Sequence, residues 1–141
     1  MREILFRGRC NEVGKYKGHW IEGYYGEDEG RNEILFSTKI GIVGYSCEPE
    51  SIGQYTGLTD KNGKKIFEGD ILKIIHKYQS PFDDDTKEYT DITTDVVFFD
   101  DEGLCFSYGK SPFLCVVDNV TAEYEVIGNI HDNPELLEVK E

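Results

Sequence analysis

Histidine and cysteine are the residue types of this chain that are best suited to metal binding. The chain has three histidines and four cysteines, which are His19, His76, His131, Cys10, Cys47, Cys105 and Cys115. No histidine lies a few residues from another histidine or from a cysteine, and no Cys-x-x-Cys pair occurs. Zinc sites usually contain such close pairs. We therefore expect no metal ion and no other cofactor, and a structural role for each histidine.

Covalent catalysis would require a nucleophile, a base and an orienting group that meet in space. The histidines and cysteines could supply such a set, but their spacing does not assemble one. The chain has no Gly-x-Ser-x-Gly motif, no P-loop and no dinucleotide-binding fingerprint. We expect a protein that is not an enzyme and has no catalytic residues. An uncharacterised enzyme is the alternative, and it would need a deep pocket that holds a histidine beside a cysteine or a carboxylate.

The acidic segment over residues 79–91 is the place to look for a calcium site. It contains three consecutive acids, Asp83, Asp84 and Asp85. In an EF-hand loop that began at Asp83, Lys87 would occupy a ligand position, Glu88 the glycine position and Thr94 the last ligand position. None of the three fits the pattern. We therefore predict a solvated, mobile loop and no calcium site.

The net charge of −13, from 28 acidic and 15 basic residues, restricts the possible partners. Direct binding to nucleic acid or to an anionic membrane is disfavoured, because both surfaces are polyanionic. The charge supports solubility, and it also suits a basic protein partner or a mimic of DNA. No signal peptide and no apolar stretch of about 20 residues is visible. We expect a cytoplasmic location with reduced thiols, and Cys105 and Cys115 as small buried hydrophobes.

Aromatic side chains offer another means of recognition, because small β-barrels often bind peptides or single strands through surface aromatics. No basic residue lies among Trp20, Tyr24 and Tyr25 in the sequence, so core packing or a protein interface fits better than nucleic-acid stacking. The possible interaction surface combines three aromatic residues with the acidic loop: Trp20, Tyr24, Tyr25, Asp83, Asp84 and Asp85.

A β-hairpin around Asp60-Lys61-Asn62-Gly63 is the clearest local structure in the sequence. Asp60 suits the first position of a type I turn and Gly63 the fourth. Gly63 can then adopt the left-handed conformation that closes a three-residue loop with a bulge. This register places Asp60 opposite Lys64 and Leu58 opposite Ile66. We therefore expect Asp60, Asn62 and Gly63 to be structural turn residues.

Nine or ten short strands with polar turns between them, and almost no helical period, predict an all-β fold. Residues 51–141 suit an SH3-like, partly open barrel that carries the acidic loop 79–91. Residues 1–50 would form a β-rich N-terminal part, and the two parts are expected to form one compact unit. Asn133-Pro134-Glu135 is a helix-start signal, so we predict a short C-terminal helix over 133–139.

Three segments of the chain, taken together and in order, resemble one known family. Met1-Arg2-Glu3-Ile4-Leu5-Phe6-Arg7 is similar to its opening strand, and residues 54–58, 60–64 and 66–71 are similar to its central signature. Residues 124–130 and 133–137 are similar to its C-terminal signature. The family is the YopX family of phage and prophage proteins. The resemblance implies a small β-rich protein with no catalytic residues to transfer, and segments 8–50 and 79–91 show no family pattern.

The leading hypothesis for function is a phage- or prophage-encoded accessory protein that binds another protein of the host or the phage in the bacterial cytoplasm. Its basis is the β-rich pattern, the acidic charge and the family resemblance. The alternative from another class is an acidic DNA mimic or a regulator of a nucleic-acid-binding protein. Exposed strand edges in so β-rich a chain make a homo-oligomer an open alternative.

Overall fold

The computed structural model describes residues 4–79, 82, 88–100, 105–108, 115–116 and 122–137. The fold is all-β, as predicted: these residues form the strands β1–β11 and two short 3₁₀ turns, η1 and η2. Contacts divide the chain into two compact units, Met1–Gly57 and Leu58–Glu141, called here the N-terminal and C-terminal units. The strand β5 (Gly53–Thr59) begins in the first unit and ends in the second.

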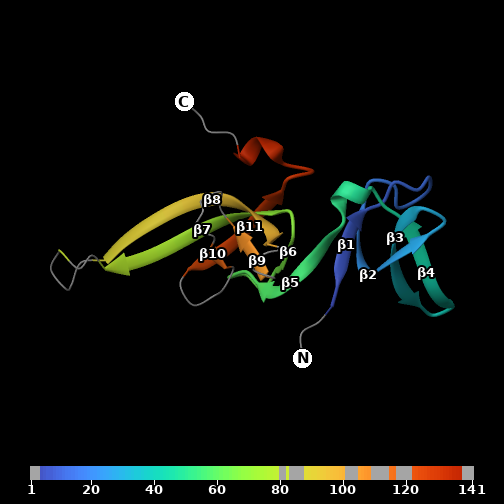
Figure 1. The fold of residues 1–141 in the computed structure, drawn as a ribbon, viewed down its shortest axis with the longest axis horizontal. Helices are drawn as coiled ribbons and strands as arrows, with labels where there is room; N and C mark the ends of the chain where they lie inside the picture. The colour runs from blue at the N-terminus through green and yellow to red at the C-terminus, as the bar shows by residue number, and fades with distance from the viewer. Residues whose placement is uncertain are drawn as a thin grey trace. The chain divides into compact units, whose positions relative to one another are not determined.

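The N-terminal unit contains an antiparallel sheet with the strand order β4-β3-β2-β1-β5 (Figure 1). Its other strands are β1 (Phe6–Arg9), β2 (Trp20–Asp28), β3 (Arg31–Thr38) and β4 (Gly41–Ser46), and η1 (Pro49–Ser51) precedes β5. The first half of β2 pairs with β1 up to Gly23, and the second half pairs with β3 from Tyr24 onward. A Cβ atom at Gly23 would overlap the backbone carbonyl of Leu35. Glycine therefore allows β3 to approach where β2 changes partner.

The core of the N-terminal unit lies where the ends of β1 and β4 meet. Cys10 and Cys47 follow these strands directly and form an isolated antiparallel bridge. Both are buried in one cluster with Ile21 and Ile34. Partly buried side chains pack around this cluster, namely Phe6, Phe36, Tyr45 and Ile52. The sheet thus curls until its edge strand β4 reaches the end of β1.

The turn between β5 and β6 (Lys65–Phe67) lies in the C-terminal unit and is closed by backbone hydrogen bonds. The N–H of Asp60 donates to the carbonyl of Lys64 over 2.7 Å, and the N–H of Gly63 donates to the carbonyl of Asp60 over 3.0 Å. Gly63 has φ = 83°, so it adopts the left-handed conformation that a type I turn with a bulge requires. Leu58 packs on the core cluster that contains Ile66.

The rest of the C-terminal unit contains a five-stranded antiparallel sheet in the order β10-β9-β8-β7-β11 (Figure 1). Its strands are β7 (Asp70–Gln79), β8 (Glu88–Asp100), β9 (Cys105–Tyr108), β10 (Cys115–Val116) and β11 (Glu123–Asn129). Its core is a cluster of buried apolar side chains, namely Ile66, Leu72, Ile74, Val97, Ala122 and Tyr124. The start of β7 is fixed by the N–H of Phe67, which donates to the buried carboxylate of Asp70 over 2.7 Å.

The long β7–β8 hairpin corrects the predicted bounds of the acidic loop. The prediction placed residues 79–91 in a loop, but β7 extends through Gln79 and β8 begins at Glu88. Tyr78 lies opposite Tyr89 in this hairpin, and their stacked rings are 5.7 Å apart. Cross-strand aromatic pairs of this kind stabilise strands. The polar sequence of these strand ends gave no strand signal, so the prediction placed them in the loop. Asp83, Asp84 and Asp85 lie outside the described residues.

The predicted helix over 133–139 is not found as such in the described residues. Residues 133–137 instead contain the 3₁₀ turn η2 (Pro134–Leu137), in which the N–H of Leu136 donates to the carbonyl of Asn133 over 3.1 Å. The side-chain oxygen of Asn133 accepts the N–H of Asn129 in β11 over 3.3 Å, so it points back to the strand.

Within the described part of the chain the sheets form no closed barrel. The side chains of Cys105 and Cys115 are outside what the structure describes.

Candidate functional site

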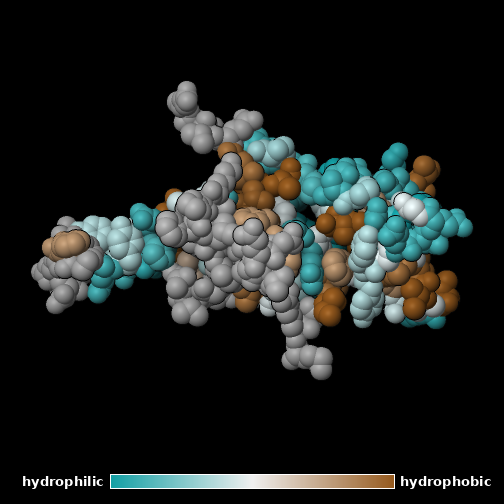
Figure 2. Space-filling view, in the orientation of Figure 1, coloured by the Kyte–Doolittle hydropathy of each residue, from teal (hydrophilic) through white to brown (hydrophobic). Residues whose placement is uncertain are grey.

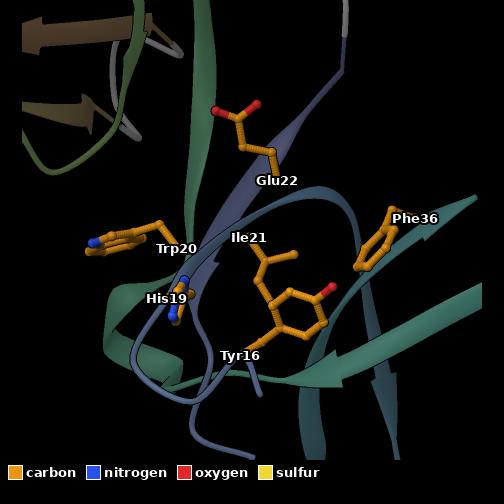
Figure 3. Close-up of a pocket in the computed structure, with 6 residues that line it drawn as sticks. All are labelled: Tyr16, His19, Trp20, Ile21, Glu22 and Phe36. Carbon is orange, nitrogen blue, oxygen red and sulfur yellow. The ribbon is translucent and has the colours of Figure 1, made fainter. Parts of the chain in front are cut away.

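A pocket of about 390 Å³ opens beside the first half of β2 (Figure 3). It is called here the β2 pocket, and six residues line it: Tyr16, His19, Trp20, Ile21, Glu22 and Phe36. Aromatic rings predominate among them, and Glu22 supplies the one carboxylate of the lining. The volume falls within the range of pockets that bind small ligands. All six residues belong to the N-terminal unit.

The alternation of side chains along β2 places the lining on both sides of the strand. Figure 3 shows Ile21 on the same side as Tyr16 and Phe36, with Trp20 on the other side. Ile21 is buried and Trp20 is half-buried, whereas the Glu22 side chain is exposed. The β2 pocket therefore joins an apolar surface to a flat indole ring and an accessible carboxylate.

Backbone hydrogen bonds hold the base of the loop that carries Tyr16 and His19. The N–H of Gly18 donates to the carbonyl of Cys10 over 2.8 Å, and the N–H of Cys10 donates to the carbonyl of His19 over 2.9 Å. The ring of Tyr16 lies edge-on to Tyr45 of β4 at 5.2 Å and to His19 at 6.3 Å. These contacts fix the loop against the sheet, so the pocket is formed before any partner binds.

Trp20 is held against two arginines of β1. In the β1–β2 register Trp20 lies opposite Arg9, and Glu22 lies opposite Arg7. The guanidinium carbons of Arg7 and Arg9 are 4.8 Å and 6.0 Å from the centre of the indole ring, within the range of cation–π attraction. Arg9 is fixed in turn by an ion pair of 2.8 Å between its Nε and Oε2 of Glu48.

Arg7 and Arg9 are residues of the candidate site that the sequence did not predict. They lie far from Trp20 along the chain, and only the pairing of β1 with β2 brings basic groups next to this aromatic ring. The spacing of Arg7 and Arg9 could have indicated that they act together, because residues two apart in a strand lie on the same face. Trp20 therefore lies beside two basic side chains, although no lysine or arginine is its neighbour in the sequence.

The structure separates the three aromatic residues of the predicted interaction surface. Trp20 lines the β2 pocket, whereas Tyr24 lies further along the same face of β2 and is 64% exposed. Tyr25 lies on the opposite face, where its hydroxyl donates to Oδ1 of Asn32 over 2.6 Å. Other apolar side chains of this unit are also exposed, among them Ile40 and Ile42. Figure 2 shows apolar surface patches between hydrophilic ones.

The three histidines lie on different elements. His76 of β7 stacks on Tyr78 at 5.7 Å, and the N–H of His131 after β11 donates to the side-chain oxygen of Asn129 over 3.0 Å. His19 lines the β2 pocket together with Glu22, but Figure 3 shows its imidazole apart from that carboxylate. Within the described residues no group of His, Cys, Asp and Glu side chains is placed to hold a metal ion. No described helix has the length and apolar character needed to cross a bilayer.

The carboxylate of Asp60 holds the β5–β6 turn and β11 together. Its Oδ1 accepts the N–H groups of Asn62 and Lys64, and its Oδ2 accepts the N–H of Val126, each over 2.9 Å. Burial by itself raises the pKa of Asp60, but the three N–H donors and the charge of Lys64 outweigh it and hold the pKa below its ordinary value. The strongest turn signal of the sequence therefore marks a structural site.

The negative charge is distributed unevenly between the two units. Residues 1–57 carry seven Lys and Arg against nine Asp and Glu, a net charge of −2. Residues 58–141 carry eight against nineteen, a net charge of −11. The β2 pocket thus belongs to a nearly neutral unit of a strongly acidic chain.

Comparisons with known proteins identify the family. A solved structure that resembles the chain is the crystal structure of protein EF1440 from Enterococcus faecalis, with 24% sequence identity, coverage of 98% of this chain and 100% of that chain, and a TM-score of 0.48. No protein of curated function matches the chain. The family model described as YopX protein matches residues 6–138. Because this match spans nearly the whole chain, the protein belongs to the YopX family.

Proposed function

We propose that this protein is a non-enzymatic binding module, encoded by a phage or prophage, that recognises a basic protein in the bacterial cytoplasm. The proposed ligand of the β2 pocket is an extended segment of that protein which contains proline and arginine. The preformed β2 pocket, built around a fixed indole ring, is the observation that carries this proposal.

The aromatic lining supports recognition of an extended, proline-containing segment. Grooves lined by aromatic side chains bind such segments because the polyproline conformation is already ordered before binding. Trp20 offers a flat ring on one side of β2, and Tyr16 and Phe36 line the pocket on the other side of the strand (Figure 3). The arginines of β1 and the contacts of Tyr16 hold these rings in place, which lowers the entropy lost on binding.

The charge supports a basic partner. Glu22 places an accessible carboxylate in the lining of the pocket, where an arginine of the ligand can form a charge-assisted hydrogen bond. The net charge of −13 attracts basic proteins over longer distances and accelerates their association. Both effects favour arginine over acidic residues in the ligand, whereas Arg7 and Arg9 beside Trp20 favour an uncharged residue such as proline at the indole ring.

Trp20 is the single tryptophan of the chain, so its fluorescence reports directly on the β2 pocket. We would titrate the protein with a proline- and arginine-containing peptide, with the same peptide after replacement of proline by glycine, and with a third peptide in which glutamate replaces arginine. The first peptide is expected to change the Trp20 emission with a saturable isotherm, and the other two to bind at least about tenfold more weakly.

Two variants at exposed positions of β2 are compared. Glu22→Gln removes the charge from the pocket, whereas Tyr24→Ala removes an exposed aromatic ring that lies on the same strand but outside the pocket. Glu22→Gln is expected to weaken binding of the arginine peptide several-fold, and Tyr24→Ala to leave it unchanged. Equal binding of all three peptides, or the absence of any saturable change, would show that this pocket does not recognise such segments.

The concentration of charge in residues 58–141 favours a second candidate, an acidic DNA mimic or a regulator of a nucleic-acid-binding protein. Such a protein would bind its basic partner through rows of carboxylates and not through the β2 pocket. Binding of a basic DNA-binding protein that persists in Trp20→Ala, and that duplex DNA competes away, would favour this candidate over the first.

We also propose that the C-terminal unit is a partly open, SH3-like barrel that is followed by the 3₁₀ turn η2. The β5–β6 hairpin and the five-stranded sheet of this unit provide the strands that such a barrel needs. Backbone amide contacts measured by NMR across the ends of the sheet would test this assignment. A homo-oligomer remains part of the proposal, and light scattering would measure it.

A further inference from the structure

Cys10 and Cys47 face each other across an antiparallel bridge, far apart in the sequence but adjacent in the core of the N-terminal unit. The two hydrogen bonds of this bridge flank the cysteines: the N–H of Asn11 donates to the carbonyl of Ser46 over 3.0 Å, and the N–H of Glu48 donates to the carbonyl of Arg9 over 2.9 Å. Cys10 and Cys47 are therefore a non-hydrogen-bonded pair. In such pairs the Cα atoms approach to about 4.5 Å.

That spacing falls within the range of disulfide-bonded cysteines, whose Cα atoms are about 4.4–6.8 Å apart. Both side chains belong to the same buried cluster, and both thiols are free. Gly8 provides room beside them, because a Cβ atom at this position would lie 2.9 Å from Cβ and 3.1 Å from Sγ of Cys47. The backbone around the pair can thus accommodate a bond between the two sulfur atoms.

We propose that Cys10 and Cys47 are a latent disulfide site that a low-molecular-weight disulfide oxidises. One cysteine thiolate attacks a sulfur of the small disulfide and releases one small thiol. The second cysteine then attacks the resulting mixed disulfide, so that the Cys10–Cys47 bond forms and a second small thiol leaves. The two protein thiols lose two electrons and two protons in total, and the small disulfide is reduced to two thiols.

Burial determines how this reaction proceeds. Cys10 is 2% exposed and Cys47 is 1% exposed, so the small disulfide reaches them only when the unit opens. Burial, and to a smaller extent the nearby Cys10, raises the pKa of Cys47 to about 11. Little thiolate is therefore present at neutral pH. Exchange in the folded protein is therefore slow, it accelerates as the pH rises, and it is fast when the chain refolds in the presence of the oxidant. Once formed, the bond is protected from reduction by the same burial.

The bond would close the sheet covalently where the ends of β1 and β4 meet, and it would tie down the base of the loop at Gly18 and His19 through Cys10. A crosslink between residues so far apart in the chain stabilises mainly by restricting the unfolded state. We expect the oxidised protein to melt roughly 5–10 °C above the reduced protein. This inference does not depend on what the β2 pocket binds.

The test uses the full chain refolded with oxidised glutathione and, in parallel, with a reducing agent. Peptide mapping by mass spectrometry without reduction is expected to recover one fragment that links Cys10 to Cys47, and thermal unfolding is expected to show the higher Tm. The double variant Cys105→Ala/Cys115→Ala retains Cys10 and Cys47, and it is expected to behave like the wild type in both measurements. Cys47→Ala is expected to lose both the linked fragment and the oxidation-dependent change in Tm.

A wild-type protein that yields no Cys10–Cys47 fragment after oxidative refolding would overturn the proposal. So would a linked protein whose Tm is lower than that of the reduced form, because the bond would then strain the bridge. The mapping of the wild type decides the matter even if Cys47→Ala fails to fold.

Discussion

At the residue scale, Asp60 and Trp20 are both held by several partners, but with different consequences. Asp60 is 6% exposed, and its carboxylate satisfies three backbone N–H groups, so it stabilises a turn and offers nothing to a ligand. Trp20 is fixed by the arginines of β1 while it still lines a pocket. The turn motif around Asp60 therefore stabilises the fold, whereas the single tryptophan belongs to the candidate site.

Replacement of Asp60 by Asn tests this account of the turn. The variant is expected to lose about 3 kcal/mol of unfolding free energy, because a charged acceptor of three N–H groups is replaced by an amide. Asp91→Asn removes an exposed carboxylate of the same unit and is expected to change stability by less than about 0.5 kcal/mol. Urea denaturation measures both variants, and equal losses would contradict the structural role of Asp60.

The pH dependence of stability follows from the same carboxylate. The pKa of Asp60 is lower in the folded state than the ordinary value of 3.8, so its stabilising contribution is fully present above that value. The contribution is lost as the pH falls through the folded-state pKa. Asp60→Asn is therefore expected to flatten the acidic end of the stability profile. An unchanged profile below the ordinary pKa would assign the acid sensitivity to other carboxylates.

At the scale of elements, the change of partner along β2 shapes the candidate site. The strand pairs with β1 where it carries Trp20 and Glu22, and with β3 from Tyr24 onward. Gly23 lies between these two halves and is buried. The close approach of the Leu35 carbonyl explains why a residue without a side chain stands there.

Gly23→Ala is expected to destabilise the N-terminal unit by about 3 kcal/mol or more, because its Cβ atom would displace the backbone of β3. Gly63→Ala is the matched variant, since its Cβ atom would meet nothing within 4 Å. That variant is expected to cost about 1–2 kcal/mol, which reflects only the left-handed backbone conformation. Thermal unfolding distinguishes the two, and a similar cost for both would mean that β3 moves away easily.

The sequence predicts these elements where local chemistry decides them. Asp60, Asn62 and Gly63 form a turn whose residues interact with one another, so the β5–β6 hairpin could be read from the chain alone. The contacts of Trp20 with Arg7 and Arg9, and the bridge of Cys10 with Cys47, depend on the pairing of distant strands. The 3₁₀ turn at Pro134 differs from the predicted helix because Asn133 bonds back to β11. Local signals contain no information about such partners.

At the scale of the whole molecule, the nearly neutral N-terminal unit and the acidic C-terminal unit suggest a division of roles. In the proposed function, the pocket of the first unit would supply contacts to a ligand segment, and the net charge of the chain would attract a basic protein. The two contributions differ in their response to salt, because ions screen charge but not aromatic contacts.

An increase in ionic strength from about 0.05 M to about 0.5 M is therefore expected to slow association with the arginine peptide more than it accelerates dissociation. Stopped-flow measurement of Trp20 fluorescence gives both rate constants. A salt-independent association rate constant would show that the acidic charge of the chain plays no part in recognition.

The affinity of the proline- and arginine-containing peptide for Trp20→Ala, set beside Tyr24→Ala, tests the central claim most directly. Trp20 forms a wall of the β2 pocket, whereas Tyr24 is the more exposed aromatic residue of the same strand. Isothermal titration is expected to give a Kd at least about tenfold higher for Trp20→Ala and an unchanged Kd for Tyr24→Ala, with the Tm of each variant confirming that it is folded. Equal affinity of the wild type and a folded Trp20→Ala variant would contradict the account.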